Sequence, residues 1–386
     1  MRGRGGRSSA LAMKGKKFSY DRLFRDLHKA YYDARRKKRN RDYQLHFESR
    51  LEQNLRELCD ELYNRTYRAR PSACFIISDP KYREVFAADF RDRIVHHLYF
   101  NYLHEMLERT FIVDSYSCIR RRGTSFGIWR LEEHIRKASL NYTEKCYVLK
   151  LDIRGYFMHI KREKLLEIVL RRIENMSSHR IFRHHPQTWG DMLDMDFLRW
   201  LSEEIIMLNP LENCVIHGKP SDWDKLPREK SLFHAPEGCG LPIGNLTSQL
   251  FSNVYLGELD DFMKRTLKCR HYGRYVDDFY VVSPDKVWLR SLIPQVRDFL
   301  KNELELDLQE GKTVICDVKN GVEYLGHFLK NGRRRVSHAT WDRMKAKWKS
   351  WHEERDPVLL AARITSYRGM IFSFFSIKVG NIKKNN

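Results

Sequence analysis

Tyr275-Val276-Asp277-Asp278 leads into an apolar run, Phe279-Tyr280-Val281-Val282. Aromatic and β-branched residues favour strands, so this stretch predicts a β-hairpin with two adjacent carboxylates at its tip. Successive side chains of a strand point to opposite faces, which predicts that one aspartate faces a reaction centre while its neighbour supports it. Carboxylates in apolar surroundings are costly unless a cation neutralises them. Asp-Asp pairs also occur in ordinary turns, so the tetrapeptide alone leaves both interpretations open.

A second buried-strand pattern, Val148-Leu149-Lys150-Leu151-Asp152, also ends in a carboxylate, and Gly155 follows it as a turn residue. One carboxylate from a strand end and a pair from a distant hairpin suit two divalent cations about 3.5–4 Å apart, which stabilise the attacking and leaving oxygens of a phosphoryl transfer. Oxygen ligands without a nearby His or Cys favour Mg²⁺ over zinc. The two motifs together predict phosphoryl transfer.

The third motif is a loop, Gly240-Leu241-Pro242-Ile243-Gly244, followed by a helix predicted over 246–256. Glycine beside a helix start lets the backbone approach a bulky ligand, here the nascent base pair, although an ordinary loop-to-helix junction has the same pattern. Taken in the order Asp152, this loop, then Asp277-Asp278, the chain resembles the palm of a reverse transcriptase.

The form of the loop narrows the resemblance. Ile243-Gly244-Asn245-Leu246-Thr247-Ser248-Gln249 is similar to the loop of reverse transcriptases from diversity-generating retroelements, whereas most retroviral and group II intron enzymes carry Gln-Gly and end in Ser-Pro. The resemblance runs from about residue 20 to the C-terminus. Other segments that resemble this family are 83–93, 114–116, 122–124 and 230–233.

The resemblance implies an α+β right-hand polymerase fold, in which an antiparallel palm sheet packs on helices. Its expected parts are a basic, partly disordered extension (1–40), fingers (41–145), a palm (146–330) and a basic helical thumb (331–386). An insertion at 176–236 is too long for a structureless loop, and we expect it to add helices at the fingers–palm junction. Residue patterning predicts strands at 74–78, 84–87, 146–153, 274–283 and 313–328, and helices within 20–67 and at 94–107, 161–175, 246–265 and 285–303.

Catalytic roles are implied in the same way. Asp152 and Asp277 are the expected first metal ligands, Asp278 supports them, and the backbone carbonyl of Ile153 is a further ligand. The expected cofactor is a pair of Mg²⁺ ions, with Mn²⁺ as a substitute. The implied reaction is attack of a primer 3′-hydroxyl on the α-phosphate of a dNTP, catalysed largely by electrostatics and alignment.

Nucleotide contacts also follow from the resemblance. Phe157 matches the family's steric gate, which would exclude a ribose 2′-hydroxyl, while its spacing alone fits a core phenylalanine equally well. Arg83 suits a triphosphate because its planar fork binds phosphate oxygens bidentately. Lys312 matches a lysine near the pyrophosphate, with a surface lysine as the alternative. The predicted dNTP-binding residues are Lys81, Arg83, Tyr156, Phe157, Ile243, Gly244 and Lys312.

Ile243 stands where accurate reverse transcriptases usually carry glutamine. An isoleucine cannot donate a hydrogen bond to the incoming nucleotide's sugar, so correct geometry is enforced less strictly. The resemblance therefore implies an enzyme prone to misincorporation, especially opposite template adenine.

The net charge of +21 is concentrated at the two ends of the chain. Residues 1–50 hold 16 Lys or Arg against 5 Asp or Glu, and residues 330–386 hold 14 against 4. Two basic ends around a neutral body suit a protein that grips a polyanion, although a solvated helix face is the alternative for any one run. The predicted nucleic-acid contacts are Arg35, Arg36, Lys37, Lys38, Arg39, Lys345 and Lys349.

The eight cysteines are scattered without a Cys-x-x-Cys pair, which argues against a zinc site or a disulfide framework and fits a reducing cytosol. No apolar run approaches the roughly 18–20 residues of a membrane span. We therefore expect a cytoplasmic protein without membrane contact, and the resemblance to retroelement reverse transcriptases implies that it is prokaryotic or phage-encoded.

The resemblance implies that the enzyme copies a template-repeat RNA into adenine-mutagenised cDNA for diversity-generating retrohoming. Its implied partners are the template-repeat RNA, the primer or cDNA, dNTP and a small basic accessory protein. Two alternatives remain open at this point. One is a reverse transcriptase of the retron, group II intron or CRISPR-associated type, and the other is a non-catalytic RNA-binding protein built on an inactive palm.

Overall fold

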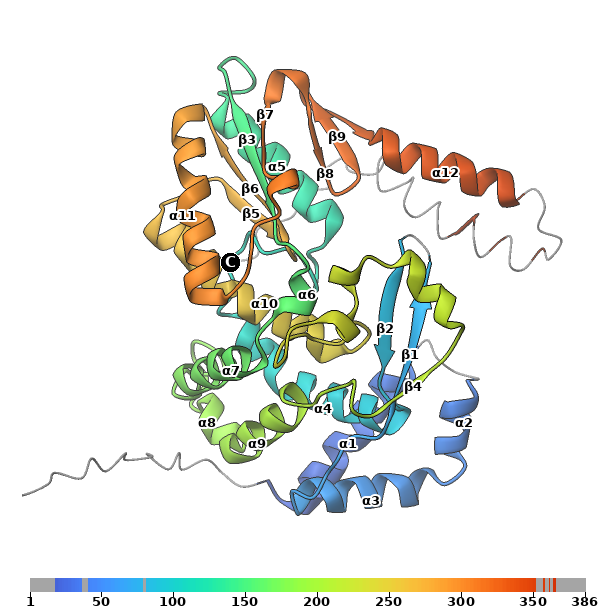
Figure 1. Cartoon of the computed structure of the whole chain (residues 1–386). Coiled ribbons are helices and arrows are strands. Elements are labelled where there is room, and N and C mark those ends of the chain that lie inside the picture. The colour runs from blue at the N-terminus through green and yellow to red at the C-terminus, as the bar shows by residue number, and fades with distance from the viewer. Residues whose placement is uncertain are drawn as a thin grey trace, which may run out of the picture. The chain divides into compact units, whose positions relative to one another are not determined.

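The computed structural model describes residues 18–36, 41–78 and 81–351, together with 357, 361, 364 and 365 (Figure 1). Most of the predicted N-terminal extension lies outside these residues. The chain forms two compact units, each built from separate segments of sequence, and the predicted division into fingers, palm and thumb stays a prediction. The first unit comprises Met1–Ile112, Arg154–Asp260 and Leu300–Leu306; the second comprises Val113–Ile153, Asp261–Phe299 and Asp307–Asn386.

The first unit is mainly helical, as the spacing of apolar residues predicts. In α1 the side chains of Leu23, Leu27 and Ala30 are buried at helical spacing, and Ser19 caps the helix by accepting from the backbone N–H of Arg22. This face packs on α3 and α4. The helices in the first segments of this unit are α1 (Tyr20–Arg35), α2 (Asp42–Glu48), α3 (Leu51–Tyr63) and α4 (Phe90–Glu108).

Further helices of this unit come from the segment after residue 153. The helix predicted at 161–175 is α7, and α9 of the insertion packs against it. The helix predicted at 246–265 is α10 followed by a short π-helical turn, Phe262–Thr266. These helices are α6 (Tyr156–His159), α7 (Arg162–Ser177), α8 (Trp189–Met192), α9 (Met195–Ile206) and α10 (Leu246–Asp261).

A small sheet in the first unit combines β1 (Ser72–Ile77), β2 (Arg83–Ala87) and β4 (Cys214–Ile216) in the order β2-β1-β4. β1 and β2 are antiparallel, whereas β4 runs parallel to β1. β4 belongs to the insertion at 176–236, which was expected to add helices and for which no strand was predicted. The three residues of β4 are too few to show an alternating pattern, and two of them are exposed, so local patterning could not reveal the strand.

The insertion is attached to this sheet by one buried carboxylate. Glu84 of β2 is 1% exposed and accepts hydrogen bonds from Trp223 Nε1 (2.7 Å), Ser231 Oγ (2.8 Å) and the backbone N–H of Leu232 (2.6 Å). Trp223 and Leu232 lie in 3₁₀ turns, and Ser231 is the N-cap of the turn that begins at Leu232. The 3₁₀ turns of the insertion are Pro220–Lys225, Arg228–Lys230 and Leu232–His234.

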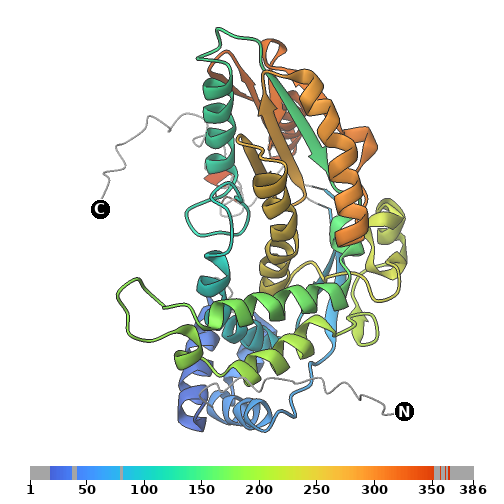
Figure 2. The ribbon, with the colours of Figure 1, turned by 90° about the vertical axis from the view of Figure 1, so that its left-hand side faces the viewer.

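The second unit contains the predicted antiparallel sheet packed on helices. Its strands follow the order β5-β6-β3-β7, and every neighbouring pair is antiparallel. α5 covers one face and α11 lies along the other (Figures 1 and 2). Ile128 and Leu131 of α5 pack with Val148 and Tyr280 in one core cluster. The elements are α5 (Thr124–Ala138), β3 (Tyr147–Asp152), β5 (Tyr272–Tyr275), β6 (Asp278–Ser283), α11 (Lys286–Leu304) and β7 (Val314–Asp317).

A second sheet follows, of three antiparallel strands in the order β10-β9-β8. The single strand predicted at 313–328 is wrong: a 3₁₀ turn at Val318–Asn320 and a left-handed turn at Leu325-Gly326 divide it into β7, β8 and β9. The segment after Gly332, expected to be helical, begins with β10 because Arg333–Val336 pairs with β9. The elements are β8 (Val322–Tyr324), β9 (His327–Lys330), β10 (Arg333–Val336) and α12 (His338–Trp351).

All eight cysteines are free thiols. Within the described ranges, no helix combines the length and the apolar character needed to cross a membrane.

Replacing Glu84 by alanine is expected to destabilise the first unit by about 3 kcal/mol, because three donors lose their buried acceptor. Urea denaturation would measure the loss, and limited proteolysis should show earlier cleavage within 212–236. The matched control is Glu167→Ala, since Glu167 is exposed and lies 3.9 Å from Arg171. Equal stability of the two variants would contradict the anchoring role of Glu84.

Candidate active site

Three carboxylates gather at one end of the second unit's four-stranded sheet. β3 ends in Asp152 and β6 begins with Asp278, and the two residues are direct cross-strand partners. Opposite residues of an antiparallel pair project from the same face, so Asp152 and Asp278 share a face. Asp277 projects from the two-residue loop between the paired residues Tyr275 and Asp278. The ranking of Asp277 as a first ligand and Asp278 as support stays a prediction.

Burial and neighbouring carboxylates raise the pKa values of Asp277 and Asp278. Burial raises the pKa of Asp277 to about 6; the charge of Asp152 adds to this, and Lys312 and Arg274 oppose it. Burial raises the pKa of Asp278 to about 7; Lys150 opposes this, and Asp152 and Asp277 add to it. Burial and the charges of the neighbouring carboxylates both disfavour the ionised forms of Asp277 and Asp278, and a bound cation would relieve both costs.

Two lysines accompany the carboxylates. The Nζ of Lys312 lies 2.9 Å from both carboxylate oxygens of Asp152. Burial lowers the pKa of Lys312, but its hydrogen bonds to Asp152 outweigh this, so the pKa stands above its ordinary value. Lys312 closes a 3₁₀ turn, Glu310–Lys312, which is held near the strand end because Gln309 donates its N–H to the carbonyl of Asp152 (2.8 Å).

Lys150 was missed at the level of sequence. It precedes Asp152 by two residues on β3 and therefore lies on the same face. The sequence did contain the evidence for its position. Side chains alternate between the two faces of a strand, so a lysine two residues before a carboxylate lies on the same face as that carboxylate.

The donor set fits a hard divalent cation, because it consists of three carboxylates without His or Cys. Within the described ranges, however, no three carboxylate, imidazole or thiolate groups are close enough to form a ready-made metal site. Lys312 holds Asp152 instead, so a metal ion has to displace or share that contact. Ile153, whose carbonyl was predicted as a ligand, is buried and bridges to Leu308, and its ligand role stays a prediction.

The remaining residues predicted to bind the nucleotide belong to the first unit, and α6 carries two of them. Gly155 precedes α6 with φ +52°, and a Cβ there would lie 2.8 Å from the ring of His159 and 2.9 Å from the carbonyl oxygen of Glu229, so the turn requires glycine. Tyr156 is buried and donates its hydroxyl to the carbonyl of Ser252 (2.7 Å). Its ring therefore belongs to the core, where it supports the half-buried ring of Phe157 at 5.3 Å between centroids.

The loop before α10 lies against β2. The carbonyl of Ile243 accepts the N–H of Phe86 (2.8 Å), and a Cβ at Gly244 (φ +132°) would stand 2.8 Å from the carbonyl oxygen of Phe86. Only glycine permits this approach. The side chain of Ile243 packs against the same apolar cluster as Phe157. The steric-gate candidate and the candidate fidelity residue thus share one packing environment.

Some of the residues predicted to contact phosphate or nucleic acid are exposed, and others form ion pairs within the protein. Lys81 and Arg83 are exposed at the start of β2. Arg35 is bound to Glu48 (2.6 Å), and Arg36 pairs with Asp33 (3.1 Å). Lys345 is exposed on α12, 4.0 Å from Asp342. The residues that lie outside the described side chains are Lys37, Lys38, Arg39 and Lys349.

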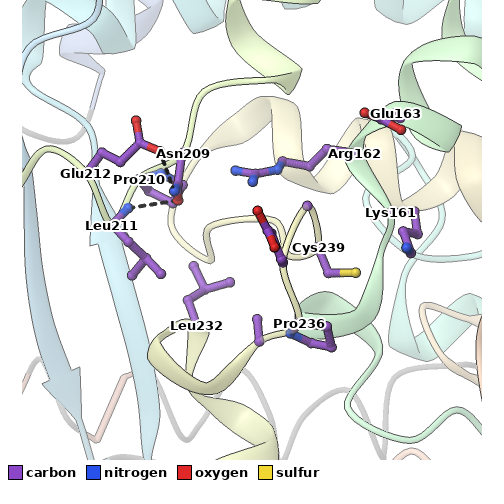
Figure 3. Close-up of a pocket in the computed structure, with 13 residues that line it drawn as sticks. Lys161, Arg162, Glu163, Asn209, Pro210, Leu211, Glu212, Leu232, Pro236 and Cys239 are labelled. Carbon is purple, nitrogen blue, oxygen red and sulfur yellow. Dashed lines mark hydrogen bonds between the residues drawn. The ribbon is translucent and has the colours of Figure 1, made fainter.

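The first unit also contains a cavity of about 520 Å³ (Figure 3). Arg162 points into it, and its Nη1 donates to the carbonyl of Leu208 (3.2 Å). Across the cavity, Asn209 donates to Glu212 (2.8 Å). The lining mixes two cations with three glutamates and includes none of the residues predicted for catalysis or nucleotide binding, so we assign it no ligand.

Residues 78–329 match the sequence model of the family described as reverse transcriptase (RNA-dependent DNA polymerase). The chain belongs to the reverse transcriptase family. The matched range contains Asp152, the loop at 240–245 and Asp277-Asp278, and leaves both basic ends outside. This reverse transcriptase is also similar to Protein YkfC of Escherichia coli (strain K12), with 24% identity over 322 residues that cover 75% of this chain and 74% of that protein.

Solved telomerases resemble part of this reverse transcriptase. Apo telomerase of Candida tropicalis, truncated from its C-terminal domain, gives a TM-score of 0.47 at 11% identity, covering 69% of this chain and 55% of that one. Telomerase of Candida albicans in complex with the TWJ fragment of telomeric RNA gives 0.46 at 11% identity, covering 70% and 46%. The chain therefore spans about half the length of these telomerases.

The raised pKa values of the metal-free protein predict an unusual pH dependence. A carboxylate whose pKa is raised by folding favours the folded state at low pH, and this contribution is lost as the pH rises through 6 to 7. Between pH 5 and pH 8, in the presence of EDTA, Asp278→Asn should gain about 2 kcal/mol of stability relative to the wild type. Urea denaturation at the two pH values measures the difference.

The control is Asp298→Asn, which alters an exposed carboxylate on α11 and should follow the wild type at both pH values. Saturating Mg²⁺ should remove most of the advantage of Asp278→Asn, because the metal compensates the ionised carboxylates of the wild type. Parallel pH profiles for Asp278→Asn and the wild type would show that folding does not raise the pKa of Asp278.

Proposed function

We propose that this protein is an RNA-directed DNA polymerase that adds dNTPs to a primer by a two-metal mechanism. The observation that carries the proposal is the placement of Asp152, Asp277 and Asp278 at one end of an antiparallel sheet, within the range that matches the reverse transcriptase family. The non-catalytic alternative is disfavoured because all three carboxylates are present and interact electrostatically.

In this mechanism, Asp152, Asp277 and Asp278 hold the metal ions. When bound, two Mg²⁺ ions stabilise the attacking and leaving oxygens of the phosphoryl transfer. Lys312 brings a fixed positive charge to the cluster, suited to the negative charge that develops on pyrophosphate. Lys81 and Arg83 provide exposed cations for the triphosphate, and Phe157 provides a flat ring for the sugar.

Incorporation of dNTPs on a primed RNA template with Mg²⁺ tests this function. Asp277→Ala is expected to lower the rate by at least about a hundredfold, because metal binding loses a ligand on which transition-state stabilisation depends. Asp298→Ala, which removes an exposed carboxylate from α11, should leave the rate unchanged. Equal rates for wild type and Asp277→Ala, with the cognate RNA and any accessory protein present, would overturn the proposal.

We further propose that the enzyme is error-prone at template adenine and serves a diversity-generating retroelement. The support is the sequence of the loop at 243–249, together with the packing of Ile243 against the apolar cluster that Phe157 also contacts. An apolar side chain at this position offers no hydrogen bond that could discriminate correct from incorrect geometry.

Ile243→Gln is expected to lower misincorporation opposite template adenine several-fold, because the amide supplies a hydrogen bond that rewards correct geometry. Sequencing of cDNA products measures the error spectrum. Ile243→Leu is the matched control, since it keeps an apolar side chain of the same volume. An error spectrum shared by all three proteins would remove Ile243 as the source of infidelity.

The proposed partners are a template-repeat RNA, the primer or cDNA, and a small basic accessory protein, with the cytoplasm as the proposed location. The net charge of +21 supports polyanion binding. Two basic proteins repel each other in the absence of a polyanion, so we expect the RNA to bridge this chain and its accessory protein.

A further inference from the structure

Arg274 is the largest fully buried side chain among the described residues. It lies on β5, directly before Tyr275-Val276-Asp277-Asp278. A buried guanidinium is costly unless its donors are engaged, and an apolar residue would serve a strand core as well. Core packing therefore does not explain why a charged side chain lies next to the tip of the hairpin.

The guanidinium of Arg274 joins two segments. Its Nη1 donates to the carbonyl of Val276 (3.0 Å), and its Nη2 donates to the hydroxyl of Ser115 (3.2 Å). Its backbone is engaged by the same neighbour, because Arg274 N donates to the carbonyl of Asp114 (2.9 Å) and Tyr116 N donates to the carbonyl of Arg274 (3.0 Å). Arg274 thus connects the segment 114–116 to the turn of the hairpin.

The turn that receives this hydrogen bond is strained. Val276 has φ +56°, and it is one of the two loop residues between the paired residues Tyr275 and Asp278. Such loops usually place glycine or asparagine at positive φ, and a β-branched residue there is an outlier. A strained conformation persists only where its surroundings over-determine it. The donation from Arg274 to the carbonyl of Val276 is a contact of this kind.

The segment 114–116, to which Arg274 is bound, is itself held in place by hydrogen bonds. Asp114 accepts two hydrogen bonds from Arg130, at 2.6 and 3.1 Å, and the hydroxyls of Tyr116 and Tyr280 lie 2.9 Å apart. A Cβ at Gly273 would stand 2.2 Å from the hydroxyl of Tyr116, so no other residue fits against this pair. Arg274 therefore links the turn to a segment that is itself held in place by hydrogen bonds.

We propose that Arg274 is a positioning residue that sets the metal affinity of the carboxylate site by holding Val276 in its left-handed conformation, which aims Asp277. The inference rests on the proposed function, because it concerns the metal ligands assigned there. In this role Arg274 acts on the site through its contact with the carbonyl of Val276. Its positive charge also lies near Asp277, so the experiment has to separate charge from geometry.

Mn²⁺ binding to the full-length protein without nucleic acid, measured by isothermal titration calorimetry, provides that separation. Arg274→Lys keeps the charge and loses the forked contact, and should raise the dissociation constant about tenfold. Val276→Gly should leave affinity near that of the wild type, because glycine adopts positive φ without strain. In the double variant, Val276→Gly should restore most of the affinity lost in Arg274→Lys. Arg290→Lys, on an exposed face of α11, is the matched control.

Each outcome decides the inference. Equal affinity of Arg274→Lys and the wild type would overturn it and leave the proposed function standing. A loss that Val276→Gly does not restore would also overturn it, because the effect would then come from packing and not from the turn. If the wild type bound Mn²⁺ no better than Asp277→Ala, both the proposed function and this inference would fail.

Ser115→Ala provides a second route if Arg274→Lys does not fold. It removes one acceptor of the guanidinium and leaves the contact with Val276, so we expect about a threefold loss of Mn²⁺ affinity with retained thermal stability. Unchanged affinity in Ser115→Ala would overturn the inference.

Discussion

Repulsion among Asp152, Asp277 and Asp278 is the constraint on which the second unit depends. Register places two of these carboxylates opposite each other, and a tight turn places the third beside them. Three cationic side chains partly compensate this charge. Lys312 binds Asp152, and Lys150 lies on the same face of β3 as Asp152. Arg274 is buried next to the turn and donates to the carbonyl of Val276. A flexible support would let the carboxylates separate, so the site needs the central strand β3, which is paired on both edges.

In the first unit, the residues predicted to bind the nucleotide are positioned by close contacts between backbone segments and not by charge. Gly155 and Gly244 allow the chain to pass where any side chain would clash, and these approaches place α6 and the loop at 240–245. Ile243 and Phe157 then share one apolar cluster. The two units therefore hold their functional residues by different physical means. Steric exclusion places the residues proposed to contact the nucleotide in the first unit, and electrostatic compensation holds the carboxylates of the second unit.

Much of this arrangement could be predicted from local patterns, because strand and helix periodicities need no knowledge of distant contacts. The period of two located β3 and β6, and the apolar spacing located α1, α7 and α11. β4 and β10 were missed, since each is short and owes its strand conformation to a partner strand. Arg274 was missed for a related reason. An arginine within a strand normally indicates an exposed position, and its burial depends on residues 114–116, about 160 positions earlier in the chain.

The contact between Lys312 and Asp152 has a consequence for the choice of ion. A tethered ammonium group gives up little translational freedom on binding, whereas a free ion gives up a great deal. A monovalent ion brings no more charge than Lys312 already supplies, so it gains nothing by replacing the side chain. A divalent ion brings twice the charge and coordinates several oxygens at once. In the proposed mechanism, Lys312 is therefore an internal counterion of Asp152 that a divalent ion gains by displacing and a monovalent ion does not.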